Sequence, residues 1–231
     1  MKYQLETFPV LEALEQKEKC PFCVLKQNCE QKELERCLGG SVMEPDCRIV
    51  INEKGFCYNH HKGLYALQNR LGHALLVHSN SITIIDKLKK IKNTKKSKAQ
   101  VMALQELFSS CVICEAVENN LERYFYTFVY LYQKEEDFKI KWQNNQEMCL
   151  PHATALIKSA WQHAHKKVAQ ELSDEVLDRL LANLIQTEKD LEWFTLKFDY
   201  RNADLPFGNS RQALPKMINI LRENQTGEES L

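Results

Sequence analysis

The chain has 231 residues, of which 44% are hydrophobic and 27% are charged, as expected for a globular protein with a sizeable core. Its formal net charge is zero, which excludes a general electrostatic attraction to nucleic acid or to anionic lipid. The 7 glycines and 6 prolines are too few turn signals for an all-β fold with many hairpins.

Residues 1–7 lack the apolar core of a signal peptide, and no apolar run approaches the length of a membrane span. We therefore expect a cytoplasmic protein without a membrane partner, in which thiols stay reduced. The chain has 9 cysteines, an odd number, and in a reducing compartment this favours metal binding over disulfides.

Helical patterns dominate the first part of the chain. Residues 1–19 are predicted to form a lead-in helix, and the strongly helix-forming run 30–36 ends at a pair of glycines. Residues 41–56 are predicted to be irregular, with a short extended piece at 48–51. From Cys57 onwards, apolar residues recur every three or four positions, which is the period of a helix.

A lysine-rich stretch at residues 87–98 is interpreted as a solvated linker between two halves of the chain. The alternative is a nucleic-acid-binding patch. It is disfavoured because the stretch has no arginine and no aromatic residue on which bases stack. This division predicts a first half at 1–98 and a second half at 99–231, packed together as one unit.

The second half repeats the helical pattern of the first. A wide apolar stripe from Val117 to Tyr132 predicts a long helix with its aromatic residues in the core. Ser173 is read as the N-cap of another long helix, followed by a loop at 202–208 and a last short helix. Together these elements predict an all-α fold, a helical bundle built from two similar halves.

Two cysteine motifs each occur twice, and they are the strongest signal in the sequence. Cys20-Pro21-Phe22-Cys23 is followed by Cys57-Tyr58-Asn59-His60, and Cys111-Val112-Ile113-Cys114 is followed by Cys149-Leu150-Pro151-His152. The first cysteines of the two motifs lie 37 residues apart in one copy and 38 in the other. Such matched spacing predicts an internal repeat with two metal sites.

Thiolates and imidazoles arranged as a tetrahedron are the ligands that Zn²⁺ prefers in structural sites. Each half is predicted to form its own site: one ion is bound by Cys20, Cys23, Cys57 and His60, and the other by Cys111, Cys114, Cys149 and His152. An iron–sulfur cluster is a weaker interpretation, because a lone histidine ligand is less usual there. The other cysteines, Cys29, Cys37 and Cys47, have no counterparts in the second half and are predicted not to be ligands.

The chain also resembles an uncharacterised domain-of-unknown-function family of anaerobic Gram-positive bacteria. The resemblance covers nearly the whole chain and rests on the two CxxC…CxxH halves, the segments 43–46 and 52–57, and the C-terminal motif DYRNAD-x-P-x-GNSR at 199–211. It departs from the family pattern at Gln212 and Lys216, where an aspartate and an arginine are expected. The resemblance implies membership of the family and no particular activity.

The C-terminal motif places Arg201 and Arg211 near one another in sequence, within a dense group of polar residues. One interpretation is a salt-bridged turn that holds the last helix in place. The other is an anion pocket in which both guanidinium groups bind a phosphate or a carboxylate. We favour the structural interpretation.

The sequence therefore predicts a non-enzymatic zinc protein that acts as a scaffold or interaction module, with an unidentified protein as its partner. The alternatives are a zinc-dependent hydrolase or a thiol redox enzyme, and, further off, a nucleic-acid-binding protein. The sequence lacks H-E-x-x-H, a P-loop and a dinucleotide-binding fingerprint, which leaves the enzyme interpretations without a catalytic motif.

Overall fold

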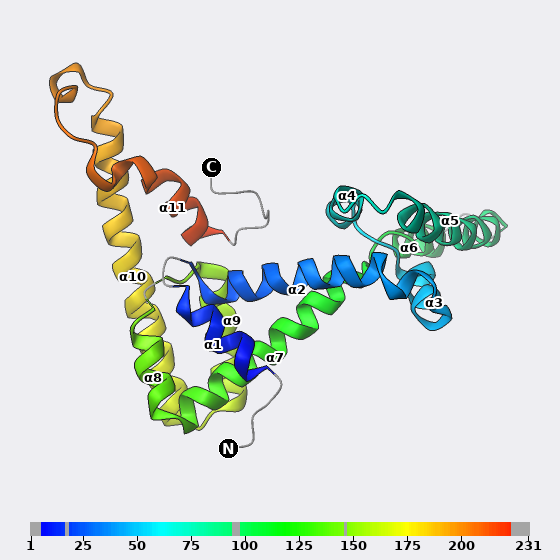
Figure 1. Ribbon diagram of the computed structural model, residues 1–231, viewed down its shortest axis with the longest axis horizontal. Coiled ribbons are helices and arrows are strands. Elements are labelled where there is room, and N and C mark those ends of the chain that lie inside the picture. The colour runs from blue at the N-terminus through cyan, green and yellow to red at the C-terminus, as the bar shows by residue number, and fades with distance from the viewer. Residues whose placement is uncertain (1–5, 17–18, 94–97, 146, 223–231) are drawn as a thin grey trace. The chain divides into compact units, whose positions relative to one another are not determined.

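The computed structural model describes residues 6–16, 19–93, 98–145 and 147–222 (Figure 1). Within these residues the regular structure is entirely helical, made of α-helices and short 3-10 helices with no strand. The predicted all-α fold is confirmed. None of the helices in these ranges combines the length and the apolar character needed to cross a membrane.

The chain forms two compact units. The first unit consists of Met1–Gln27 together with Leu121–Leu231, and the second unit is Asn28–Asn120. The boundaries fall inside two helices, α2 (Pro21–Leu38) and α7 (Val112–Lys134). These units differ from the predicted halves, which meet at residue 98, because the N-terminal segment packs with the C-terminal part of the chain.

The first unit begins with α1 and the start of α2. Helix α1 spans Thr7–Glu15. The unit continues with the later part of α7 and then, in chain order, with α8 Glu136–Gln143, α9 Leu150–His163, α10 Lys166–Leu196, η2 Tyr200–Asn202, η3 Gly208–Gln212 and α11 Ala213–Leu221. Helix α10 packs against α9 and α11, and Figure 1 shows α11 lying beside it.

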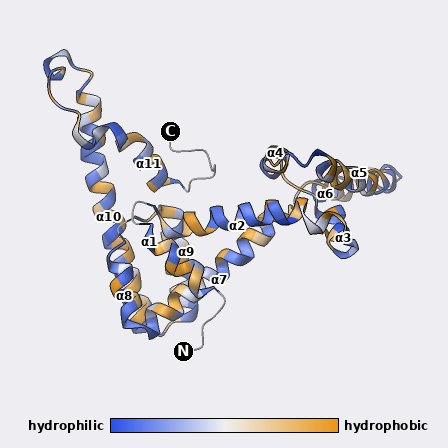
Figure 2. Cartoon of the chain, viewed as in Figure 1, coloured by the Kyte–Doolittle hydropathy of each residue, from blue (hydrophilic) through white to orange (hydrophobic). Residues whose placement is uncertain are grey.

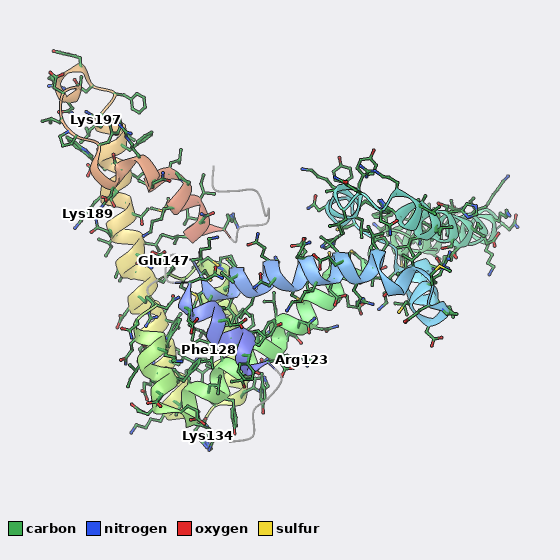
Figure 3. The ribbon with its side chains drawn as sticks, viewed as in Figure 1. Arg123, Phe128, Lys134, Glu147, Lys189 and Lys197 are labelled. Atoms are coloured by element: carbon green, nitrogen blue, oxygen red, sulfur yellow. The ribbon has the colours of Figure 1, made fainter. Side chains whose placement is uncertain are left out.

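Aromatic residues form the centre of the first unit. Phe22 stacks on Phe125 with ring centroids 4.2 Å apart. Phe128, labelled in Figure 3, meets Phe138 and Trp142 edge to face at 5.0 Å each. All five side chains are buried. Phe125, Phe128 and Tyr132 of α7 are therefore core residues, as the helical spacing predicted, whereas Tyr126 and Tyr130 of the same helix are exposed, so the prediction is wrong for these two.

A buried arginine closes this core. The Arg179 guanidinium lies 3.8 Å from the centroid of the Trp142 ring and donates hydrogen bonds to the carbonyls of Trp142 and Asn145. It also pairs with Glu175 at 2.8 Å. Both the charge and the donors of Arg179 are thus satisfied inside the protein, which a buried cation requires.

Helix α10 starts earlier than the sequence indicated. It begins at Lys166, and the predicted N-cap Ser173 lies inside it, where its hydroxyl donates to the Ala169 carbonyl at 2.6 Å. Ala169 and Leu172 are fully buried, and their packing extends the helix toward its N-terminus. A serine inside a helix can bond back to the preceding turn in this way, so its capping potential is not used.

The second unit contains the rest of α2, the start of α7 and five further elements: η1 Gly40–Val42, α3 Pro45–Lys54, α4 Tyr58–Ala66, α5 Arg70–Lys92 and α6 Lys98–Glu106. The irregular segment predicted at 41–56 is instead largely helical. Pro45 stands at the first position of α3, where a proline favours a helix start, and Ile51 is buried.

Helix α5 holds α3 in place but leaves apolar side chains in solvent. Asn80 donates to the Asn52 carbonyl of α3 at 2.9 Å. Ile82, Ile85 and Leu88 are between 40% and 49% exposed. Figure 2 shows hydrophobic and hydrophilic residues side by side along the helices, as in amphipathic helices.

Candidate metal centres

All four cysteine motifs share one local structure. In each, the first cysteine immediately precedes a helix: Cys20 before α2, Cys57 before α4, Cys111 before α7 and Cys149 before α9. The second candidate ligand is then the third residue of that helix, so both donors lie at its N-terminus. The positive end of the helix dipole favours thiolates at these positions.

Two of these helix ends meet in the first unit. The Cys20, Cys23, Cys149 and His152 donor atoms lie within 4.8 Å of one another, and we call this group the first metal centre. The Nδ1 atom of His152 is 3.1 Å from the Cys149 Sγ, 3.3 Å from the Cys23 Sγ and 3.7 Å from the Cys20 Sγ. Of the four residues, only Cys23 is not fully buried.

The other two helix ends meet in the second unit. Cys57, His60, Cys111 and Cys114 form the second metal centre, again with all donor atoms within 4.8 Å. The Nδ1 atom of His60 is 3.2 Å from the Sγ atoms of both Cys57 and Cys111 and 3.4 Å from that of Cys114. This centre is more open, because Cys114 is exposed and Cys57 is half-buried.

The eight predicted ligands thus come together, but in a different grouping from the predicted one. The sequence assigned Cys57 and His60 to the same ion as Cys20 and Cys23. In the structure Cys20 and Cys23 meet Cys149 and His152, while Cys57 and His60 meet Cys111 and Cys114. The predicted grouping by halves is therefore wrong.

Packing near the second centre gives the physical reason. The Val112 amide at the start of α7 donates to the Gly55 carbonyl at 3.1 Å, and the Ser110 hydroxyl donates to the Lys54 carbonyl at 3.0 Å. Lys54 also pairs with Glu115. Gly55 has φ +66°, a backbone conformation that favours glycine, and it turns the chain from α3 into Cys57. These contacts bring the starts of α4 and α7 together.

Both centres have the dimensions of a single tetrahedral metal ion. With Zn–S bonds of about 2.3 Å and Zn–N bonds of about 2.0 Å, neighbouring sulfurs lie about 3.8 Å apart and sulfur and nitrogen about 3.5 Å apart. The Cys23 and Cys149 sulfurs are 3.7 Å apart, and so are those of Cys57 and Cys114. The donor types and their spacing therefore fit one ion of this kind at each centre.

The electrostatics of the first centre make a cation favourable there. Burial raises the pKa of the Cys20 thiol to about 12, because a thiolate without a counterion loses its hydration. A bound divalent cation reverses this effect, since a coordinated thiol gives up its proton. At neutral pH the Cys20 thiol is therefore ionised only when a cation is bound beside it.

In the second centre, His60 and Cys111 each stabilise the charged form of the other. Burial opposes ionisation of both groups, but the contact between them outweighs it. It lowers the pKa of Cys111 to about 6 and, together with Glu30, raises that of His60 to about 10. Burial and the nearby Cys111 raise the pKa of Cys114 to about 12. The Cys111 and Cys114 thiols therefore ionise together at neutral pH only when a cation joins them.

Glu30 supports the second centre from outside, and no sequence pattern identified it. Its carboxylate lies 3.0 Å from the Nε2 atom of His60, on the opposite side of the ring from the three sulfurs. Metal-binding histidines usually donate their second ring N–H to a carboxylate or a carbonyl, which fixes the tautomer and the ring orientation. Glu30 thus leaves Nδ1 of His60 free to bind metal.

We expect Glu30→Ala to weaken metal binding at the second centre by about 10–100-fold, because His60 loses the partner that orients it. The first centre should keep its affinity. Competition with a chromogenic chelator measures the two affinities, and Glu35→Ala on the same helix is the control, since Glu35 contacts Gln31 and neither centre. An equal loss at both centres would contradict this role of Glu30.

The remaining candidate ligands lie outside both centres. Cys29 is buried and accepts a hydrogen bond from Asn120 at 3.2 Å, Cys37 is buried, and Cys47 lies beside Glu44. None of the three belongs to a metal-binding group among the described residues. His61, next to a ligand in sequence, points elsewhere and contacts His73 at 3.0 Å between ring nitrogens.

The C-terminal motif is held together by a lysine that the sequence analysis did not single out. Lys197, buried at the end of α10 and labelled in Figure 3, donates to the carbonyls of Asn202, Ala203 and Leu205 at 2.5–2.9 Å. The Trp193 indole donates to the Pro206 carbonyl at 3.1 Å. The loop is therefore ordered by contacts to its backbone.

The two arginines of this motif lie in different surroundings. The Arg201 guanidinium donates hydrogen bonds of 2.5–3.1 Å to both carboxylate oxygens of Asp199. This ion pair lowers the pKa of the Asp199 carboxyl. Arg211 lies 4.9 Å from the centroid of the Phe207 ring. These contacts suit the structural interpretation of the motif, and the anion pocket stays an untested prediction.

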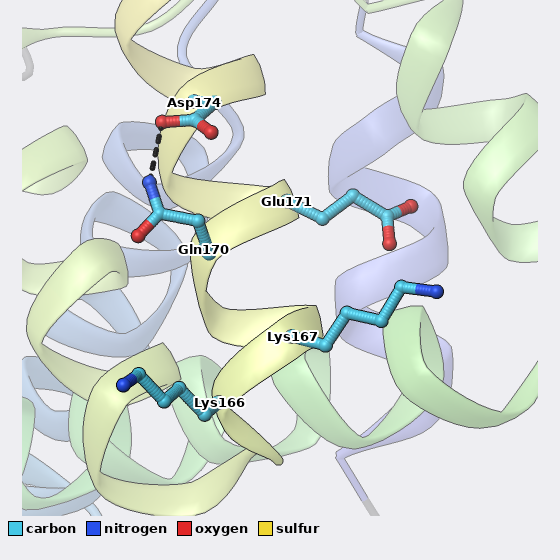
Figure 4. A pocket seen from close by; sticks show the side chains of 5 residues that line it. All are labelled: Lys166, Lys167, Gln170, Glu171 and Asp174. Carbon is cyan, nitrogen blue, oxygen red and sulfur yellow. Dashed lines mark hydrogen bonds between the residues drawn. The ribbon is translucent and has the colours of Figure 1, made fainter.

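A shallow pocket lies along the first turns of α10, lined by Lys166, Lys167, Gln170, Glu171 and Asp174 (Figure 4). Gln170 donates to Asp174 at 2.8 Å, and Lys167 extends to the same side of the helix as Glu171. None of the predicted site residues lines this pocket, and its mixed charges favour no particular ligand.

Comparison with known proteins places the chain in a family. It is 21% identical over 198 residues to the "Uncharacterized 23.9 kDa protein in xynA 3'region" of Caldicellulosiruptor sp. (strain Rt8B.4), a match that covers 82% of this chain and 87% of that protein. No solved structure matches. The model of the "Family of unknown function (DUF6062)" matches residues 1–228, and the protein belongs to this family.

Proposed function

We propose that this protein is a non-enzymatic zinc protein, in which two Cys₃His sites fix a helical scaffold for interaction with another protein. The observation that carries the proposal is the convergence of two helix N-termini at each centre, with three sulfurs and one imidazole nitrogen at tetrahedral spacing. Four protein ligands complete the coordination of zinc and leave no position for a catalytic water.

The spacing of the donors also supports zinc over an iron–sulfur cluster. A cluster binds its cysteines through different iron atoms, so its sulfurs lie further apart than the ligands of one ion. Here all four donor atoms of each centre lie within 4.8 Å. The proposed protein partner would contact exposed apolar residues of α5 and of the turn after α6, among them Ile82, Ile85 and Phe108.

Metal analysis of the purified protein, combined with X-ray absorption at the zinc edge, tests this proposal. We expect two zinc ions per chain and an average shell of three sulfurs and one nitrogen, with Zn–S distances of about 2.3 Å. An oxygen ligand in the shell would contradict closed sites and favour the zinc hydrolase. Iron in place of zinc would overturn the choice of metal.

A further inference from the structure

The two metal centres differ in the access of solvent to their sulfurs. In the first centre Cys20 and Cys149 are buried and Cys23 is half-buried. In the second centre Cys114 is exposed and Cys57 is half-buried, with 3.7 Å between their Sγ atoms. Oxidation of cysteine depends on thiolate character and on exposure, so the second centre is the more reactive one.

We propose that the second metal centre is a site of reaction with hydroperoxides. Cys114 is oxidised first, a disulfide with Cys57 follows, and the metal ion is released. This inference rests on the proposed function, since it requires that the second centre holds a metal ion.

The geometry supports each step. Cys114 lies in the first turn of α7, and the metal ion that this inference requires keeps its sulfur a thiolate. Its sulfur is exposed, so a small peroxide can reach it without any rearrangement of the helix. Cys57 is the other solvent-accessible sulfur of this centre, whereas Cys111 is only 7% exposed.

The reaction balances with one hydroperoxide. The Cys114 thiolate attacks the outer oxygen of hydrogen peroxide, so that an S–O bond forms while the O–O bond breaks. Hydroxide leaves and takes up a proton to become water, and the sulfur, having lost two electrons, is a sulfenic acid. The Cys57 thiolate then attacks this sulfur, an S–S bond replaces the S–O bond, and the second hydroxide also becomes water.

The disulfide removes two of the four ligands of the second centre. Only Cys111 and His60 remain, and two donors do not satisfy an ion that requires four. The first centre keeps its ligands because none of its cysteines is exposed as Cys114 is. One peroxide therefore releases one metal ion from a protein that holds two.

The test uses the full-length protein loaded with zinc and treated with one equivalent of hydrogen peroxide, while a chromogenic chelator records the free zinc. We expect one zinc ion per chain to be released and the other to stay bound, because one equivalent of peroxide forms one disulfide. Alkylation and peptide mapping should then find a Cys57–Cys114 disulfide. Equal release from both centres, or oxidation of Cys20 and Cys23 first, would overturn the proposal.

Two variants sharpen the result. Cys114→His keeps four donors but removes the exposed thiol, so the zinc that it binds at the second centre, even with a changed affinity, should no longer be released quickly by peroxide. Cys47→Ser removes a half-buried thiol outside both centres and should behave like the wild type. Release from Cys114→His at the wild-type rate would refute a reaction at Cys114.

If Cys114→His fails to fold, peptide mapping of the oxidised wild type tests the proposal by itself, through the presence or absence of the Cys57–Cys114 disulfide. A protein that carries fewer than two ions before peroxide is added would contradict the proposed function itself. A protein that carries two ions and resists peroxide at both centres would contradict only this inference.

Discussion

Two double variants are expected to differ by one bound metal ion per chain. Cys20→Ala combined with Cys149→Ala removes two ligands from the first metal centre only, so one ion should remain. Cys20→Ala combined with Cys57→Ala removes one ligand from each centre, so both ions should be lost in the presence of a competing chelator. The grouping by halves predicts the opposite order.

The loss of an ion should also unfold the unit that holds it. Structural zinc contributes on the order of 10 kcal/mol to folding at neutral pH, which matches the whole stability of a typical domain. Hydrogen exchange of the Cys20→Ala, Cys149→Ala variant should therefore show lost protection in the first unit and retained protection in Asn28–Asn120. Protection lost mainly within Asn28–Asn120 would contradict the assigned grouping.

Lys197→Met is expected to destabilise the first unit by about 2–4 kcal/mol, because the carbonyls that its ammonium binds lose a charged donor. Methionine preserves most of the aliphatic volume, so the effect reports on the hydrogen bonds. Thermal and urea unfolding of the variant and the wild type measure the difference in the free energy of unfolding.

Arg201→Ala is the matched control in the same loop. Its guanidinium pairs with Asp199 on the surface, with a side chain that is 73% exposed, and such pairs contribute little to stability. We expect a melting temperature close to that of the wild type, both with and without phosphate. A loss of phosphate-dependent stabilisation in Arg201→Ala would instead support the anion pocket.

The ligands of both centres could be predicted from sequence because each motif carries its geometry locally. A cysteine before a helix and a second donor at its third residue converge whatever surrounds them, as at Cys57 and His60. The grouping could not be predicted, because both copies present the same local motif. Contacts remote in sequence, such as the one between Gly55 and Val112, determine which helix ends meet.

The contrast between local motifs and contacts remote in sequence also explains the other places where the structure differs from the sequence prediction. The helix α3 replaces a predicted irregular segment because Pro45 starts a helix and packing against α5 overrides the weak helix propensity of Ile49 and Val50. Glu30 and Lys197 act through partners that no spacing reveals. Their roles depend on His60 and on the carbonyls of a later loop, which only the tertiary structure brings near.

The nested order of the two ligand sets has a consequence for synthesis on the ribosome. The ligands of the second centre span residues 57–114, whereas the first centre joins Cys20 to His152, 132 residues later. The second centre is thus nested inside the first and is complete while the partners of Cys20 and Cys23 are still untranslated. Once formed, it shortens the loop that the first centre has to close, which lowers the entropic cost of closure. Until the second centre forms, Cys57 and His60 are the candidate ligands nearest in sequence to an ion held by Cys20 and Cys23, so correct assembly has to avoid or undo that pairing.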